Sequence, residues 1–150
     1  MPSPENAELL DAMADQIRTA LDDALSDASF NVQVEPRLVF APSPPTVDMY
    51  PGDLARGTEA RAFGTEGEFL FTVRCRVNPN DADANQDILL GMMDDVNALS
   101  VPMALLDEPT LGGLAADVDV RDVTGFNLYP FGADSLVGFQ FTAVVVRADS

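Results

Sequence analysis

One run of ten residues restricts the fold of this chain more than any other stretch. From Glu68 to Val77 the sequence reads EFLFTVRCRV: the odd-numbered positions are all apolar, whereas the even-numbered ones carry charges, a hydroxyl and one leucine. Successive side chains of a β-strand point to opposite faces of the sheet, so this run predicts a strand with one buried face and one mixed face. The run from Ser135 to Arg147 alternates in the same way and predicts a second long strand. A sheet built on both needs a second layer over its apolar face.

That second layer is expected to be helical. The segment from Glu5 to Asp27 repeats apolar residues at helical spacing, with charged residues between them, which predicts an amphipathic helix. Its apolar positions are Leu9, Leu10, Met13, Ile17, Leu21 and Leu25. A short helix is expected around Val101 to Leu106, with Pro102 in the first turn, where proline is tolerated. Another helix is expected to begin at Asn80 or Asp81, and its apolar residues are Ile88, Leu89, Met92 and Met93.

Three further stretches predict shorter strands: Phe30 to Phe40, Thr46 to Tyr50, and Ala116 to Val123. In the last of them Val118, Val120 and Val123 alternate with charged residues, and the alternation is interrupted near Asp122. The stretch from Thr124 to Asp134 is expected to be a turn region. The resulting order is helix, two or three strands, two helices and two strands. It predicts a single α+β domain, with a mostly antiparallel sheet and helices packed on one face.

The composition limits the chemistry that this chain can perform. It has 25 acidic and 8 basic residues, no histidine and a formal charge of −17, and every basic residue is an arginine. The commonest general base and zinc ligand is therefore missing, and so is the amine that forms Schiff bases. None of the usual glycine-rich phosphate-binding or nucleophile motifs occurs. We expect no enzymatic activity and no cofactor, the alternative being a hydrolase or metal-dependent enzyme built on paired carboxylates.

One acidic stretch resembles the beginning of a calcium-binding loop. From Asp81 to Asp87 the sequence DADANQD spaces oxygen ligands as such a loop does. The loop requires glycine at its sixth position and a bidentate glutamate at its twelfth, where this chain has Gln86 and Met92. We interpret the stretch as the start of a helix with acidic residues in its first turn, and expect no metal site.

The sequence also indicates where the chain is made. Its single cysteine, Cys75, lies on the apolar side of a predicted strand and is expected to be a buried thiol. No apolar run approaches the roughly 20 residues of a transmembrane helix, and the N-terminal stretch is acidic and lacks the apolar core of a signal peptide. We therefore expect synthesis in the cytoplasm. An acidic surface of this kind should repel nucleic acids and anionic membranes at long range.

The longest irregular stretch follows the short strand at Thr46 to Tyr50. Prolines flank this strand on both sides, so its entry and exit are rigid. The polar segment from Asp53 to Gly67 comes next, and a loop of such length is often functional. We interpret it as an arm that contacts a neighbouring subunit or a partner, the alternative being a plain connecting loop. Its candidate contact residues are Arg56, Glu59, Arg61, Phe63 and Glu66.

Two other groups are candidate contacts between subunits. The strand from Glu68 to Val77 carries Arg74 and Arg76 on its mixed face, and it could continue a sheet from one subunit to the next. The predicted turn region holds several large apolar residues between two glycines, which either pack beneath the sheet or contact another subunit. Its candidate contact residues are Phe126, Tyr129 and Phe131.

The order of segments along the chain adds a resemblance to a known family. The segments are VQVEPRLVFAPSPPTVDMYPGD, GEFLFTVRCRVNPNDADANQDILLGMMDD, LSVPMALLDEPTLGG and GFNLYPFG. From about Ala7 to Arg147 the chain resembles the tail terminator proteins of long-tailed phages (siphoviruses) of actinobacteria, also called tail-completion or head-to-tail connector proteins. The resemblance implies a structural virion protein at the neck, which forms a six-fold ring on the head-proximal end of the tail tube. Such a ring stops tube polymerisation and presents a surface to the head connector.

The same resemblance implies the partners. They are further copies of the chain in a homohexameric ring, the tail tube protein and the head–tail connector proteins, with no membrane involved and no catalytic residue. DNA passes through such a ring without specific binding, and an acidic lumen would keep it from adhering, because basic contacts are what bind phosphate. The alternatives are another neck or tail protein, such as a tube or head-completion subunit, and an acidic mimic of DNA.

Overall fold

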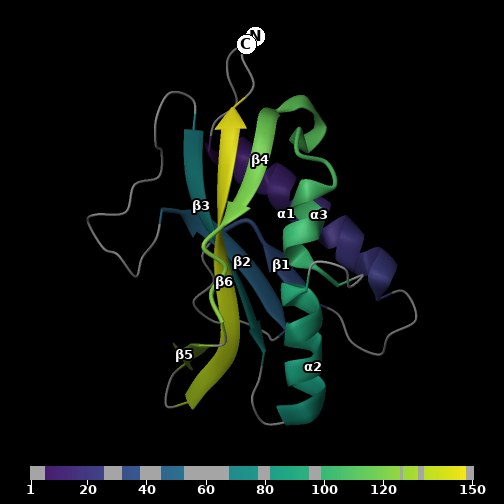
Figure 1. The fold of residues 1–150 in the computed structure, drawn as a ribbon, viewed down its shortest axis with the longest axis vertical. Helices are drawn as coiled ribbons and strands as arrows, with labels where there is room; N and C mark the ends of the chain where they lie inside the picture. Colours follow the sequence, from purple (N-terminus) through teal and green to yellow (C-terminus); the bar gives the residue numbers. More distant parts are fainter. Residues whose placement is uncertain are drawn as a thin grey trace.

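The computed structural model of the chain describes residues 6–25, 32–37, 45–52, 68–77, 82–94, 99–125, 127–131 and 134–147. Helices α1, α2 and α3 lie together on one side of the sheet (Figure 1), so the predicted α+β fold with helices on one face is confirmed. Among the described residues, no helix is long and apolar enough to cross a membrane. In chain order the elements are α1 (Asn6–Ala24), β1 (Gln33–Glu35), β2 (Thr46–Pro51), β3 (Glu68–Val77), α2 (Ala82–Met93), α3 (Val101–Leu106), the 3-10 turn η2 (Leu111–Gly113), β4 (Ala115–Arg121), β5 (Asn127–Phe131) and β6 (Asp134–Arg147).

The sheet is mixed, with the strand order β1-β2-β3-β6-β4. Strand β1 pairs with β2 in parallel, and all other pairings are antiparallel. One side of β6 pairs with β3; the other side pairs with β5 near its beginning and with β4 near its end. Strand β3 therefore has a hydrogen-bonded neighbour on each side. The expectation that it continues a sheet into another subunit is wrong, because both of its edges are occupied within the chain.

Strand β5 corrects the prediction of a plain turn region after β4. Residues Asn127–Phe131 pair with the beginning of β6, so the chain ends in three strands and not in two. The proline of this strand, Pro130, lies opposite Ser135. Proline has no N–H to donate to a ladder, and it is accepted on an edge strand such as this one. The sequence pattern did not indicate this strand, because its proline and its flanking glycines are typical of a turn.

Between β4 and β5 the chain leaves the ladder and returns to it. Asp122 has a φ of 55°, a left-handed conformation that ends the alternation of β4. The irregularity expected near Asp122 is therefore present, and Val123, which follows it, is 49% exposed and does not share the buried side of Val118. At Thr124 the chain rejoins β6: the backbone N–H donates to the Gln140 carbonyl over 2.9 Å, and the Thr124 hydroxyl accepts from the Gln140 N–H over 3.1 Å.

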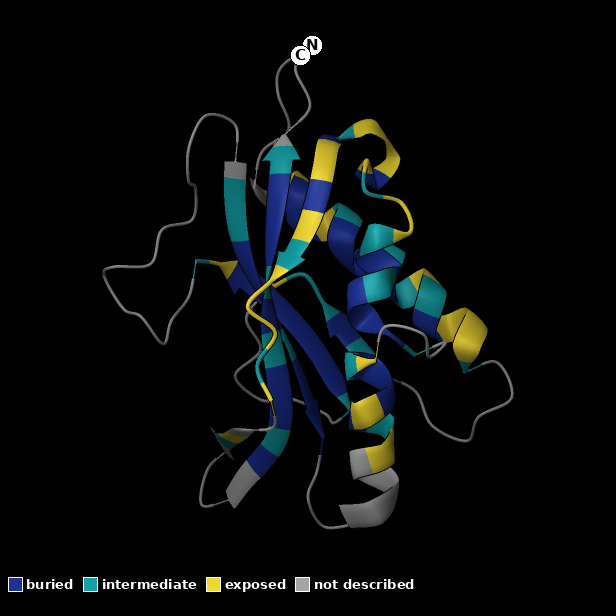
Figure 2. Ribbon diagram, viewed as in Figure 1, coloured by how far each residue is buried: buried dark blue, intermediate teal, exposed yellow. Residues whose placement is uncertain are grey.

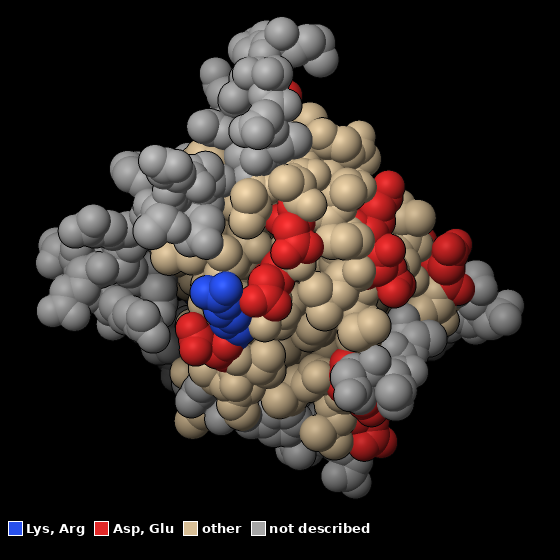
Figure 3. Space-filling view, turned by 45° about the horizontal axis from the view of Figure 1, so that its top comes forward, with Lys and Arg blue, Asp and Glu red and all other residues tan. Residues whose placement is uncertain are grey.

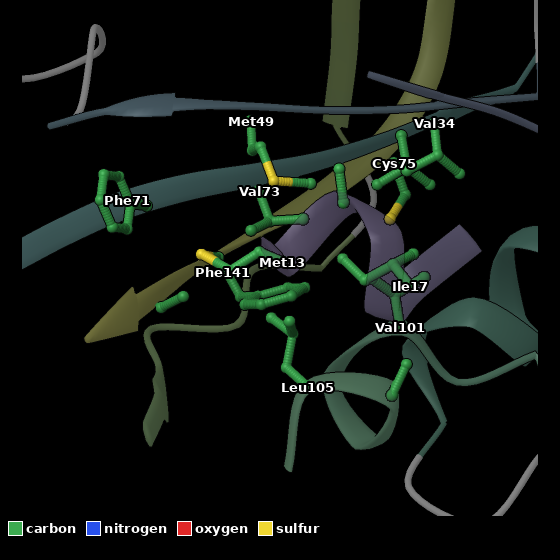
Figure 4. Packing of buried hydrophobic residues seen from close by; sticks show 14 of the residues in the cluster. Met13, Ile17, Val34, Met49, Phe71, Val73, Cys75, Val101, Leu105 and Phe141 are labelled. Carbon is green, nitrogen blue, oxygen red and sulfur yellow. The ribbon is translucent and has the colours of Figure 1, made fainter. Parts of the chain in front are cut away.

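The core lies between the helices and one face of the sheet. Figure 2 shows the buried residues on the strands and on the sides of the helices that meet them. The predicted apolar stripe of α1, represented by Met13 and Ile17, faces Val73 and Cys75 of β3 and Phe141 of β6 (Figure 4), and all five side chains are at most 1% exposed. The predicted burial of the Cys75 thiol is thereby confirmed. In α2, Leu89 and Met92 are fully buried, as the helical spacing predicts.

A tight turn carries the chain from the end of α3 to β4. Helix α3 begins at the predicted residue, where the Ser100 hydroxyl caps it by accepting from the N–H of Met103 over 3.2 Å. After α3, Leu111, Gly112 and Gly113 have φ values of 48°, 69° and 100°. Glycine adopts such values without steric cost, which explains the Gly-Gly pair at this turn. The buried side chain of Leu111 anchors the turn against the core.

Candidate functional site

The face of the sheet turned away from the helices carries a cluster of buried charges. Asp48 of β2 lies opposite Arg74 of β3, and Arg76 follows two residues further along β3. The carboxylate of Asp48 accepts from Nε of Arg74 over 3.0 Å, from Nη2 of Arg74 over 2.5 Å and from Nη2 of Arg76 over 3.2 Å. The Asp48 side chain is fully buried, and those of Arg74 and Arg76 are only 13% and 5% exposed. One carboxylate thus joins two guanidinium groups within the sheet.

Two tyrosines complete this charge cluster. The Arg74 guanidinium lies 5.2 Å from the centroid of the Tyr50 ring and 6.0 Å from that of Tyr129, within the range of cation–π attraction. The hydroxyl of Tyr129 donates to Oε1 of Gln140 over 3.1 Å. We use the name charge cluster for Asp48, Tyr50, Arg74, Arg76 and Tyr129. It joins β2, β3 and β5, which are far apart in sequence.

Gly138 of β6 makes room for this cluster. A Cβ atom at this position would lie 2.3 Å from the backbone oxygen of Cys75 and 3.0 Å from both Cγ of Arg76 and Cε2 of Tyr129. A side chain here would displace the backbone of β3 and would also crowd both neighbouring side chains. Glycine in a strand often marks such a close approach.

The pKa shifts follow from burial and from the Asp48 charge. Burial lowers the pKa of Arg74, but the hydrogen bond and the charge of Asp48 outweigh this effect and leave that pKa raised. For Arg76, burial is the largest effect and lowers the pKa, which Asp48 opposes and the neighbouring Arg74 reinforces. Burial raises the pKa of Tyr129 to about 12. The phenol of Tyr129 is therefore neutral near pH 7, next to a charged guanidinium.

This arrangement suits a structural role better than a chemical one. The guanidinium groups hold both oxygens of Asp48, and the bidentate contact with Arg74 lies across the β2–β3 ladder. Charge-assisted, bidentate pairs of this kind fix geometry as well as adding energy. Nearby, the Thr72 hydroxyl donates to the carbonyl of Gly52, which fastens the end of the β2–β3 pairing. We infer that the charge cluster holds the register of β2 against β3.

The structure brings three of the predicted contact residues together. Arg74, Arg76 and Tyr129 all belong to the charge cluster, so the first two face Asp48 and not open solvent. Phe131 lies on β5, and its side chain is outside the described part of the chain. The remaining candidates also lie outside the described residues: Arg56, Glu59, Arg61, Phe63, Glu66 and Phe126.

Sequence reasoning missed Asp48 and Tyr50. The signal was a carboxylate at the centre of the short strand TVDMY, where a charge is costly unless it is paired. The alternation of β3 placed two arginines on one face, but the pairing of this face with Asp48 depends on a register that the sequence does not give. Within the described ranges, no three histidine, cysteine or acidic side chains gather closely enough to hold a metal ion.

The net charge is strongly negative because 25 acidic residues outnumber 8 basic ones, and the described arginines are themselves paired within the chain. Each of the five arginines whose side chains are described forms an ion pair with a carboxylate of the same chain. On the face seen in Figure 3, acidic side chains are spread widely and basic atoms form one small patch beside them. The pairs are Arg18–Asp15, Arg37–Asp11, Arg74–Asp48, Arg76–Asp48 and Arg121–Asp119.

The sequence was compared with models of protein families and with curated proteins, and nothing matched in either comparison.

Proposed function

We propose that this chain is a structural subunit of a phage tail, of the tail terminator type, which forms a ring on the head-proximal end of the tail tube and joins the tail to the head connector. The resemblance of its ordered segments, from about Ala7 to Arg147, is the origin of the proposal. The observation that supports it most directly is the internal pairing of the described arginines. A protein that surrounds DNA without retaining it needs few free cations, because these are what bind phosphate.

The net charge fits a conduit for DNA. A ring of six copies carries a formal charge of 6 × −17 = −102, and its field repels phosphate throughout the lumen. The same charge opposes assembly, because the copies repel each other at low ionic strength. We therefore expect a monomer in dilute, low-salt solution, and a ring when salt screens the charge or the tube end acts as a template. A stable hexamer in sedimentation at low ionic strength would contradict this expectation.

Strand β5 is our candidate for the contact between neighbouring subunits. Leu128 on this strand is 71% exposed, the largest exposure among the large apolar side chains of the described chain. Val123, just before it along the same edge of the sheet, is 49% exposed. Apolar side chains at a sheet edge are a common feature of association surfaces. The stretch around Tyr129, for which the sequence suggests a subunit contact, includes this strand.

Two matched variants test this contact. Leu128→Glu places a charge on β5, and Leu90→Glu places one on α2, where Leu90 is 54% exposed. Neither leucine is buried, so both variants should fold, as far-UV circular dichroism would show. We expect Leu128→Glu alone to abolish ring formation at high salt in analytical ultracentrifugation. Rings of normal stability in Leu128→Glu would remove β5 from the interface.

The segment from Asp53 to Gly67 is proposed to contact a neighbouring subunit or the tube. Its ends are joined to adjacent antiparallel strands, since Pro51 lies opposite Phe71 and the Gly52 N–H donates to the Leu70 carbonyl over 2.8 Å. With Gly52 opposite Leu70, an Asn-Gly insert followed by Glu68 and Phe69 makes a four-residue loop, a common length for such a hairpin. Replacing residues 53–67 by Asn-Gly should therefore leave the fold intact and yield overlong, unterminated tails. Tails of normal length assembled with this variant would end the idea.

Electron microscopy of the purified protein with isolated tail tubes tests the function itself. A terminator should bind as a ring at one end of each tube and should stop further addition of tube protein. A tube subunit, the main alternative, should polymerise into long tubes by itself. Failure to bind tubes at any salt concentration would refute the terminator role, and failure to polymerise alone would refute the tube-subunit role.

A further inference from the structure

A second surface feature lies on the helical side of the molecule. An open groove of about 550 Å³ runs between α1 and the segment that leads from the end of α3 into η2. We call it the α1–α3 groove. Its lining includes five small or apolar residues, which are Ala12, Ala20, Ala104, Leu111 and Gly112. It also includes four carboxylates, which are Asp15, Asp23, Asp107 and Glu108.

The walls of this groove are fixed to each other. Nε2 of Gln16 on α1 donates to the carbonyls of Ala104 and Leu105 at the end of α3, over 2.8 and 3.1 Å, and lies 3.1 Å from the carbonyl of Glu108. One amide therefore bridges the two walls and donates to carbonyls at the end of a helix, where carbonyl groups have no hydrogen-bond partner within the helix. The groove is preformed, so a ligand does not have to organise it.

The carboxylates of the groove are placed against the helix dipoles. Helix α1 has no basic residue in its last turn and carries Asp23 there, and α3 has none either and is followed by Asp107 and Glu108. The C-terminus of a helix is its negative end, where cations stabilise and carboxylates destabilise. Asp15 is paired with Arg18, but no ion pair found within the described residues includes the other three. These three acids are exposed and lie at or just beyond the negative ends of two helices, where a positively charged partner would be favourable.

We propose that the α1–α3 groove binds a positively charged segment of another protein. The apolar stems of its arginine or lysine side chains pack on the alanines that line the groove, and their charged ends approach Asp23, Asp107 and Glu108. Long basic side chains bury their stems and keep their charged ends near solvent in this way. Complementary charge also speeds association and selects the partner.

Two other occupants fit the groove less well. A second copy of this chain carries a charge of −17, and its five described arginines are already paired. A divalent metal ion needs converging ligands, whereas the acidic side chains of the described chain form no group of three that could hold one. The groove also lies on α1 and α3, away from β5 (Figure 1), so it is a different surface from the contact proposed on that strand.

The test uses a fluorescein-labelled octa-arginine peptide and two variants of the full chain. The groove variant is Asp23→Asn, Asp107→Asn and Glu108→Gln together. The matched variant removes three exposed carboxylates elsewhere: Asp87→Asn, Asp117→Asn and Asp122→Asn. Both variants change the formal charge from −17 to −14, since −17 + 3 = −14, and both keep side-chain shape. Far-UV circular dichroism establishes that each is folded.

We expect fluorescence anisotropy at low salt to show about tenfold weaker binding for the groove variant, which is the combined effect of three exposed charge contacts. The matched variant should bind within about twofold of the unaltered protein, because it keeps the three groove carboxylates. Long-range attraction changes equally in both variants, so any difference between them comes from the groove. Amide shifts in NMR spectra should centre on Gln16, Ala104 and Leu111. Equal losses in the two variants, shifts spread over the whole surface, or no binding by the unaltered protein would each overturn the proposal.

Discussion

The substitution Asp48→Asn tests whether the charge cluster determines the stability of the sheet. The amide keeps the shape of the carboxylate but removes its charge. It also turns an N–H donor toward the guanidinium groups of Arg74 and Arg76, which are donors themselves. Two buried or nearly buried cations would then lie side by side without their shared anion.

The expected loss follows from the burial of the group. Asp48 is fully buried and accepts three hydrogen bonds from the two guanidinium groups. Removing one partner from a buried ion pair lowers the free energy of unfolding by about 3–5 kcal/mol, because the remaining charge stays buried without compensation. Most domains have a total of only about 5–15 kcal/mol. We therefore expect Asp48→Asn to lose a large fraction of the stability of the native state.

Urea denaturation followed by circular dichroism measures this loss, and the exposed pair on β4 supplies the control. Asp119 accepts from Nε of Arg121 over 2.9 Å, but the two side chains are 53% and 57% exposed. Asp119→Asn is the same substitution in the same sheet, and should cost at most about 1 kcal/mol because solvent screens the pair. Equal, small losses in both variants would refute the view that burial makes the Asp48 pair important.

Three further predictions concern the surroundings of this cluster. Gly138→Ala should lower the free energy of unfolding by about 1–3 kcal/mol, because its Cβ would lie 2.3 Å from a backbone oxygen. The control Gly125→Ala should change it by less than about 0.5 kcal/mol, because no atom lies within 4 Å of the added Cβ. Burial raises the pKa of the Cys75 thiol well above its ordinary value, so a thiol reagent should modify it only as the protein unfolds, and fast modification of native protein would contradict its position. In a Tyr50→Phe variant the sole remaining tyrosine is Tyr129, whose absorbance should still titrate above the ordinary value of 10.0, because burial is the largest cause of its raised pKa and remains when the smaller contribution of Tyr50 is removed. The pKa of Tyr129 is higher in the folded state than in the unfolded state, so the stabilising contribution of the neutral phenol is complete below pH 10.0 and declines as the pH rises toward about 12. A midpoint near 10.0 in folded protein would show that Tyr129 is exposed.

Local patterns were sufficient for most of the secondary structure. The alternation from Glu68 to Val77 gave β3 with the bounds that it has, and the helical spacing of α1 gave its buried face. These predictions succeeded because the periods of a strand and of a helix leave a direct mark on the order of apolar residues. The prediction failed at β5, where pairing with β6 outweighs a local composition typical of a turn.

The site depends on contacts that no local pattern contains. The mixed face of β3 was visible in the sequence, and it suggested that Arg74 and Arg76 were available to a partner. The structure pairs both of them with Asp48, which lies 26 and 28 residues away along the chain, and adds Tyr129 from a strand beyond β6. The α1–α3 groove likewise joins residues nearly 90 apart, through the amide of Gln16.

The sequence by itself determined the class of the fold, the apolar faces of its long strands and of α1, and the excess of acidic over basic residues. These properties follow from periodicity and composition, which are local or additive. Only the tertiary structure decided that β3 is interior, that five arginines are paired within the chain, and that the acids at two helix ends border one groove. Strand order and register set these contacts, and they depend on how all elements share one core and not on any single segment.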